Sequence, residues 1–346
     1  MTAASHGPAG RGSAIERATL IKIARETASR RMAARPSLLS AYLIGSVAAG
    51  EPLLGDATDI DLVLVDAQPP AAAREVVRLT DQVALDIHHR ARSEYANPKS
   101  LRAHPWLGPE LAEPMFLLDP QHFFELAQSS TRGQYYRAEY VAARARTFLA
   151  WARGALHIGL LPGAEPEAPV SLDDYGQALF NAANATISLT GFPGAGRRLV
   201  MKLEAAASKL GRPEAYENFQ ALFGGSDLPA DRAEALLADW QEAYQAGQSA
   251  TDERIHPARR SIYWRGFRAQ IQADRAAEGL WLMLVTWNAC MGNVPAGGSH
   301  AERWAAFLHS LGLGTPDDRA ARVGQAIDYV TEVDGIVEGW AERNGV

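Results

Sequence analysis

The chain has 346 residues, of which 47% are hydrophobic and 21% charged, the proportions of an ordinary folded protein long enough for two domains. Its net charge of −6 argues against a broad nucleic-acid-binding surface, because polyanion binding depends on clustered Lys and Arg. The single cysteine, Cys290, excludes an internal disulfide and a cysteine-based zinc site. Residues 1–12 are small and polar and lack the apolar core of a signal peptide. We therefore expect a disordered tail over 1–12 and a cytoplasmic protein without membrane attachment.

The first part of the chain has the pattern of a sheet with helices packed on it. Apolar residues at helical spacing predict a helix over about 14–34, which Pro36 ends. Two short apolar runs, at 41–44 and 62–65, predict buried strands, and a short helix is expected to begin at Ser46 between them.

The elements that follow are expected to complete the same sheet and its helices. In chain order they are a helix over 70–79, a strand over 83–87, a helix over 97–104, a strand over 115–118 and a helix over 121–127. Together they predict a small mixed β-sheet with flanking helices over residues 13–130.

Three acidic residues lie in or beside these apolar runs. Asp59 and Asp61 are two positions apart, so they project from one face of their strand while Ile60 points to the other. Asp86 interrupts the run at 83–87, where a buried carboxylate without a partner would be strongly unfavourable. Neighbouring carboxylates repel each other unless a cation lies between them, and Mg2+ prefers oxygen ligands. The three acids therefore predict a site for divalent cations, which suits transfer of a phosphoryl or nucleotidyl group.

A Gly-Ser pair, Gly45-Ser46, precedes the first acid by a gap of twelve residues. Together with the acids at 59, 61 and 86, this pattern resembles the nucleotidyltransferase domain of the DNA polymerase β superfamily over about the first third of the chain. The resemblance implies that Gly45 and Ser46 hold the phosphates of a nucleoside triphosphate, with Thr58 at a position where Ser is common. The backbone N–H groups at a helix N-terminus would favour such an anion.

The resemblance also assigns roles to the three acids. It implies that Asp59 and Asp61 bind two Mg2+ ions, and that Asp86 ligates one of them and helps to deprotonate an acceptor hydroxyl. The donor would be a nucleoside triphosphate, with ATP expected, and the transferred group would be AMP. His88 and His89 follow directly; we interpret them as the polar end of a strand, with a metal-binding role as the alternative.

Beyond residue 130 the spacing of apolar residues becomes helical. Segments rich in Ala, Leu, Glu and Arg are separated by Gly- and Pro-containing loops at 159–169, 191–196, 224–229 and 292–298. They predict a bundle of six or seven helices over 131–346 that binds the substrate. The predicted fold class is therefore α+β, with a nucleotidyltransferase domain over 13–130 followed by an all-α domain.

The loop between Ser46 and Asp59 contains no Lys or Arg, although members of the superfamily often carry one there. Arg198, Lys202 and Lys209 form a basic stripe at roughly helical spacing in the second half of the chain. This stripe is a candidate for the missing phosphate-binding charge, with Arg198 and Lys202 as the expected contacts. The alternative is a solvated helix face.

An N-terminal nucleotidyltransferase domain followed by a helical bundle is similar to the layout of the aminoglycoside nucleotidyltransferases. The expected partners are therefore a nucleoside triphosphate and a small hydroxyl-bearing acceptor, and a homodimer is left open. Two alternatives also stay open. One is nucleotidylation of a protein or a tRNA, since similar domains occur in toxin–antitoxin systems, and the acidic charge counts against the tRNA. The other is a binding module that has kept the fold without catalysis.

Overall fold

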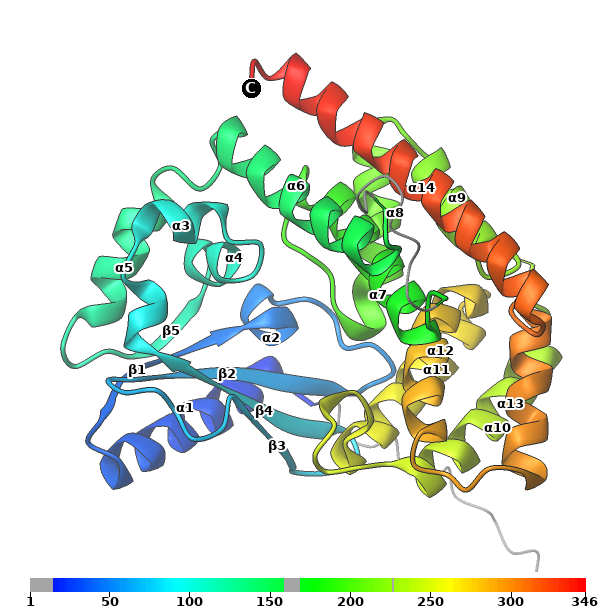
Figure 1. Cartoon of the computed structure of the whole chain (residues 1–346). Helices are drawn as coiled ribbons and strands as arrows, with labels where there is room; N and C mark the ends of the chain where they lie inside the picture. Colours follow the sequence, from blue (N-terminus) through cyan, green and yellow to red (C-terminus); the bar gives the residue numbers. More distant parts are fainter. Residues whose placement is uncertain (1–14, 159–168, 226) are drawn as a thin grey trace, which may run out of the picture.

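The computed structural model describes residues 15–158, 169–225 and 227–346, and these form a mixed α/β protein (Figure 1). The predicted tail at 1–12 and most of the predicted loop at 159–169 lie outside the described residues. All five strands of the described chain come before residue 120, and fourteen α-helices surround and follow them. Among the described residues, no helix combines the length and the apolar character needed to cross a membrane.

The strands form one mixed sheet in the order β3-β4-β2-β1-β5. β1 (Leu38–Ile44) pairs antiparallel with β2 (Thr58–Asp66), which pairs in parallel with β4 (Val83–Ala91). The edge strands β3 (Arg74–Arg78) and β5 (Met115–Leu118) pair antiparallel with β4 and β1. β2 and β4 are therefore neighbours in the sheet, although β3 lies between them in the sequence.

Every element predicted for this part of the chain is present, but one of them is a strand where a helix was predicted. The helix expected over 70–79 is wrong, because Arg74–Arg78 is the edge strand β3. Its β-branched Val76 and Val77 pair with β4, and this pairing overrides the helix-favouring alanines before them. The strands expected at 41–44, 62–65 and 83–87 all form and are longer than predicted. The helices of this part are α1 (Arg17–Ala34), α2 (Gly45–Ala49), α3 (Pro98–Ala103), α4 (Leu107–Ala112), which was not predicted, and α5 (Phe123–Arg132).

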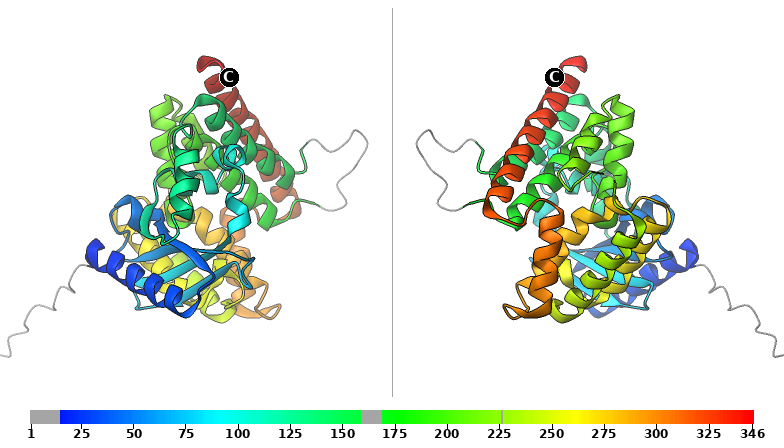
Figure 2. Two further views of the ribbon diagram at one scale, coloured as in Figure 1. Left: turned by 90° about the vertical axis from the view of Figure 1, so that its left-hand side faces the viewer. Right: turned by 90° about the vertical axis from the view of Figure 1, so that its right-hand side faces the viewer.

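The two faces of the sheet have different partners, as the views from two sides illustrate (Figure 2). One face packs on α1, where Ile60 and Leu62 of β2 share a core with Leu20 and Ala24. Part of the other face packs on α3, α4 and α5 through residues such as Tyr42, Val63, Leu101, Leu111 and Phe124. The alternation predicted for β2 is thus confirmed, and Asp59 and Asp61 project from the face opposite α1.

After residue 130 the described chain is helical without strands, as predicted, but it contains nine α-helices rather than six or seven. Short turns cause the undercount, for example the three residues from Gly211 to Pro213 that separate two helices. A large apolar cluster that includes Trp240 and Trp287 holds these helices together. The helices are α6 (Ala138–Ala155), α7 (Leu172–Ser188), α8 (Leu199–Leu210), α9 (Glu214–Ala221), α10 (Ala230–Gly247), α11 (Arg260–Gln272), α12 (Leu280–Met291), α13 (Gly298–Ser310) and α14 (Pro316–Arg343).

A buried arginine ties this helical part to the helices on the sheet. Arg144 of α6 lies over the ring of Tyr135, 3.8 Å from the ring centroid. It donates hydrogen bonds to the carbonyl oxygens of Arg102 (2.6 Å) and Tyr135 (3.1 Å). Because a buried charge is tolerated only with such partners, α6 is held in a defined position at the end of α3.

Candidate functional site

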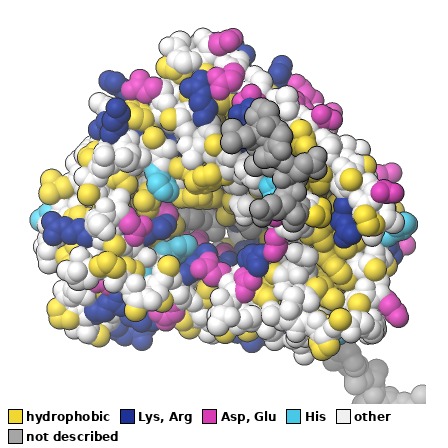
Figure 3. Space-filling model, in the orientation of Figure 1, with side chains coloured by type: hydrophobic (Ala, Val, Ile, Leu, Met, Phe, Trp, Pro, Cys, Tyr) yellow, Lys and Arg dark blue, Asp and Glu magenta, His cyan; other side chains and the backbone are white. Residues whose placement is uncertain are grey.

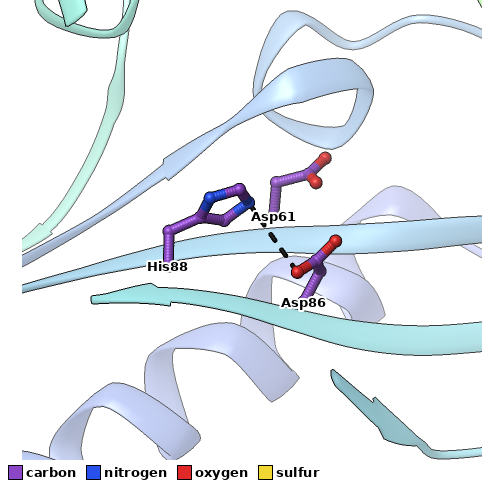
Figure 4. A group of neighbouring side chains, drawn as sticks. All are labelled: Asp61, Asp86 and His88. Atoms are coloured by element: carbon purple, nitrogen blue, oxygen red, sulfur yellow. Dashed lines mark ion pairs between the residues drawn. The ribbon is translucent and has the colours of Figure 1, made fainter. Parts of the chain in front are cut away.

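The three predicted acids lie on one face of the sheet, on two neighbouring strands. β2 carries Asp59 and Asp61, and the parallel register puts Asp61 directly opposite Asp86 of β4. The side chains of Asp61 and Asp86 point to the same side of their strands (Figure 4). The Asp86 side chain is fully buried, whereas that of Asp59 is 27% exposed. The fold therefore brings together two acids that are distant in the sequence.

A histidine completes a group that can hold a metal ion. His88 follows Asp86 by two positions, so it lies on the same face of β4 (Figure 4). Asp61, Asp86 and His88 each offer one ligand atom, and these atoms lie within 4.8 Å of one another. His88 Nε2 is 3.8 Å from Asp86 Oδ1 and is buried without a hydrogen-bond partner. Two carboxylates and one imidazole with a free nitrogen fit a divalent cation.

The sequence analysis kept a metal-binding role for His88 only as the alternative to a polar strand end, and it did not place His88 beside Asp86. The signal was its spacing of two from Asp86, which puts both side chains on one face once the strand is extended past 87. Burial and the charge of Arg74 lower the pKa of His88 to about 3. The imidazole is therefore neutral at neutral pH and can offer a lone pair.

The two facing carboxyl groups have opposite pKa shifts. Burial raises the pKa of Asp61 well above its ordinary value, and the negative charges of Asp59 and Asp86 raise it further. Burial would also raise the pKa of Asp86, but the hydrogen bonds from Arg74 and the charges of Arg259 and Arg74 outweigh it and lower the pKa. Asp86 is therefore ionised at neutral pH, and Asp61 is the acid whose ionisation a bound cation would favour.

Two arginines that the sequence analysis did not single out contact Asp86. Arg74 of β3 donates to both carboxylate oxygens, each at 2.7 Å. Arg259 ends the 3-10 helix η4 (Pro257–Arg259) and forms a buried ion pair with Asp86. The same guanidinium lies 4.0 Å from Asp59. No local pattern connects these residues, because they come from an edge strand and from a turn late in the chain.

A third arginine from the helical part lies near the acids. Arg197, in the 3-10 helix η2 (Gly196–Arg198), is 3.7 Å from Asp59. It also donates hydrogen bonds to the carbonyl oxygens of Leu54 (2.8 Å) and Ala57 (3.2 Å). Arg197 thus joins the helical part to the loop that leads into β2.

The Gly-Ser turn lies directly against the acids. Gly45 begins α2 with a φ of 70°, and a Cβ atom added there would collide with the carboxyl group of Asp61. Only glycine fits this backbone conformation and this close approach. Ser46 Oγ is 3.4 Å from Thr58 Oγ1, and the buried Thr58 hydroxyl donates to the carbonyl oxygen of Asp59 at 3.0 Å. The predicted residues Gly45, Ser46 and Thr58 are therefore neighbours of the acids.

Arg198 and Lys202, the predicted phosphate-binding residues, lie beside the Gly-Ser turn, but their charged groups contact an acidic side chain. Arg198 Nε is 3.1 Å and Lys202 Nζ is 3.4 Å from the carboxylate of Glu51, in the loop after α2. Lys209 lies farther along α8 and donates to the carbonyl oxygen of Thr190 at 3.2 Å. The helical part thus brings positive charge to the cation-poor loop, and Glu51 balances part of it.

The space-filling view has a hollow near its centre, between the sheet and the helical part (Figure 3). Acidic, basic and histidine side chains gather around it. A rim of this kind suits a charged or strongly polar ligand better than an apolar one.

A scan against protein-family models found no match to the sequence, and a search of the curated proteins found none either.

Proposed function

We propose that this protein transfers a nucleoside monophosphate, with AMP from ATP as the expected case, to a hydroxyl group and releases pyrophosphate. The observation that carries the proposal is that Asp61 and Asp86 face each other on parallel strands, beside a turn in which Gly45 closely approaches Asp61. Facing carboxylates repel each other, and a divalent cation removes that repulsion. The resemblance of this pattern to the DNA polymerase β superfamily supports the same reaction.

The reaction joins the acceptor oxygen to the α-phosphorus and breaks the bond from that phosphorus to the pyrophosphate oxygen. The resemblance implies Mg2+ as the cation, and divalent charge held by these acids would neutralise the pyrophosphate and lower the pKa of the acceptor hydroxyl. Asp86 is ionised at neutral pH and can accept the hydroxyl proton. Arg74 and Arg259 hold its carboxylate in one orientation, and catalysis then depends mainly on positioning.

The finer organisation that we propose is a catalytic domain over 13–130 and a substrate-binding helical domain over 131–346. This division is supported by the apolar clusters. The buried residues of the two main clusters on the sheet all come from before residue 130, and those of the helical cluster all come from after residue 140. Arg197 and Arg259 reach the acids from the helical part, which supports a site completed by both. The acceptor would bind between them, and a polar small molecule of the aminoglycoside type is the proposed class.

The test is pyrophosphate release by the purified chain with Mg2+ or Mn2+, each nucleoside triphosphate, and panels of aminoglycosides, tRNA and proteins. Release that depends on an aminoglycoside supports the proposal in full. Release only with tRNA or protein keeps the reaction and changes the acceptor class, whereas no release with any acceptor contradicts the reaction. Asp61→Asn should be inactive. Asp66→Asn is the matched control, because Asp66 lies at the far end of β2 and pairs with Arg35.

One observation favours a second candidate, a binding module without catalysis. Arg74 and Arg259 already neutralise the buried Asp86, so the cluster can persist without a metal ion. Calorimetry with ATP and Mg2+ separates the two candidates. A module of this kind should show no metal-dependent nucleotide binding, whereas the proposed enzyme requires it.

A further inference from the structure

We propose that this site holds one first-row transition ion, for which Mn2+ is the probe, through Asp61, Asp86 and His88, and that the guanidinium of Arg259 replaces a second ion. This inference rests on the proposed function for the role of the ion but not for its binding.

The first step concerns the third ligand. The Nε2 atom of His88 is buried, has no hydrogen-bond partner and faces Asp86 Oδ1 at 3.8 Å. Two ligand atoms that are each about 2.1 Å from one ion are at most about 4.2 Å apart, so the separation of His88 Nε2 and Asp86 Oδ1 is compatible with a shared ion. Asp86 Oδ1 accepts a hydrogen bond from Arg74 Nε and keeps a second lone pair for the ion, and the ligand atom of Asp61, which lies within 4.8 Å of the other two, completes the set after a shift of at most about 0.6 Å. Mg2+ favours oxygen ligands and retains several waters, whereas imidazole suits transition ions. His88 therefore shifts the preference of the site away from Mg2+.

The second step concerns the number of ions. The side chain of Arg259 is ion-paired with Asp86, and it lies 4.0 Å from Asp59. It thus occupies the space between an acid of β2 and the acid of β4. A guanidinium does not lose its proton in proteins, so this positive charge is permanent. It offsets the carboxylates that a second divalent ion would otherwise neutralise.

Arg259 is also a fixed part of the fold rather than a surface side chain that reaches the site by chance. The residue is 9% exposed, and its guanidinium also donates to the hydroxyl of Tyr263 at 3.3 Å. Its turn is packed on the sheet through a small apolar cluster that consists of Ala57, Ala84, Ala258 and Ile262. A second ion between Asp59 and Asp86 would have to displace this anchored group.

The experiment is Mn2+ binding to the whole chain without nucleotide, by calorimetry and by electron paramagnetic resonance. We expect one Mn2+ per chain, and we expect equimolar Mg2+ not to displace it. His88→Ala should weaken Mn2+ binding by at least about tenfold, the lower end of the loss seen when a group that supports a metal ligand is removed. His89→Ala is the matched control, because His89 is the next residue of β4, projects from the opposite face and lies 3.8 Å from Glu75.

Four results would each overturn the inference: no Mn2+ binding, two ions per chain, displacement by equimolar Mg2+, or equal losses in the two histidine variants. If His88→Ala does not fold, His88→Gln serves in its place. The glutamine side chain offers an oxygen ligand, so His88→Gln should lower the preference of the site for Mn2+ over Mg2+. An unchanged preference would contradict the inference. If Mn2+ binds as expected and no acceptor yields pyrophosphate, the proposed function fails while the ion site stands. If His88→Ala releases pyrophosphate as fast as the wild type, the inferred role of His88 in the ion site fails while the proposed function stands.

Discussion

Asp61→Asn should abolish metal binding and yet make the metal-free protein more stable. Asp61 shares its face of the sheet with Asp59, and its ligand atom lies within 4.8 Å of that of Asp86. Burial and these two negative charges raise the pKa of Asp61 well above its ordinary value. Ionising Asp61 at neutral pH therefore costs free energy, and the neutral amide of Asn avoids that cost.

The size of the effect follows from the separation of the two groups. Two unit charges no more than 4.8 Å apart repel each other by at least about 3.5 kcal/mol at an effective dielectric constant of about 20. Arg74 and Arg259 cancel much of the charge on Asp86. We therefore expect a net gain in the free energy of unfolding of about 1 kcal/mol, which corresponds to a rise in Tm of about 1.4 °C for a chain of 346 residues.

The assay is thermal unfolding of wild type and Asp61→Asn in EDTA from about pH 4 to pH 8. A carboxyl whose pKa is raised by folding binds more protons in the folded state, so wild-type stability falls as pH rises through the raised pKa. The advantage of Asp61→Asn should therefore be absent near pH 4, about the ordinary pKa of Asp, and grow as the pH rises.

Asp66→Asn is the control with the opposite sign. Burial would raise the pKa of Asp66, but hydrogen bonds from Ser37 and Arg35 and the charge of Arg35 lower it. The ionised form of Asp66 therefore stabilises the fold at neutral pH, and this stability is lost as the pH falls through the lowered pKa. Asp66→Asn should accordingly be less stable than the wild type at pH 7. Mn2+ at about 100 times its Kd should add about 2.7 kcal/mol to wild type and nothing to Asp61→Asn. An Asp61→Asn protein that is less stable than wild type at pH 8 in EDTA would refute the reasoning.

Three further predictions concern single positions. Gly45→Ala should weaken Mn2+ binding in calorimetry and destabilise the fold by more than about 1 kcal/mol. The reason is that Ala is strained at this φ and that its Cβ displaces Asp61. The control is Gly154→Ala on α6, which has open space around it and should be neutral or stabilising. Arg144→Ala should lower the free energy of unfolding in urea by about 2–4 kcal/mol, because a buried and a partly buried carbonyl group lose their donor, and a loss below about 0.5 kcal/mol would contradict this role. Cys290 is fully buried and burial raises its pKa to about 12, so a thiol reagent at pH 8 should modify it only after unfolding, and immediate reaction would disprove the burial.

The parts of the fold that the sequence predicts are those with a local signal. The alternation of Asp59, Ile60 and Asp61 assigns each side chain to a face of β2, and the structure bears this out. β3 shows the limit of such reasoning. Three alanines and a charged pair favour a helix there, and only the pairing of Val76 and Val77 with β4 turns the segment into a strand.

The candidate site divides in the same way. The acids and Gly45 stand out because a carboxylate in an apolar run and a glycine before a helix are unusual locally. Arg74 and Arg259 do not stand out, because a single Arg in a polar segment is ordinarily a solvated charge. Their contacts with Asp86 arise from the packing of distant elements. His88 lies between these cases, since its spacing from Asp86 was visible but the length of β4 was not.

The prediction for Arg198 and Lys202 illustrates how a local pattern can locate a residue without describing its partner. Their helical spacing predicts one basic face, and both do lie beside the loop that lacks a cation. Glu51, an acid of that same loop, pairs with both of them. Their contact with a phosphate stays a prediction.

The most direct test of the central claim is calorimetric binding of a non-hydrolysable ATP analogue to the whole chain, with and without Mn2+. We expect binding that requires Mn2+ in wild type and in Asp66→Asn, and no binding in Asp61→Asn. Binding of equal strength without metal, or in Asp61→Asn, would contradict the claim that Asp61 and Asp86 form a cation site for a nucleoside triphosphate.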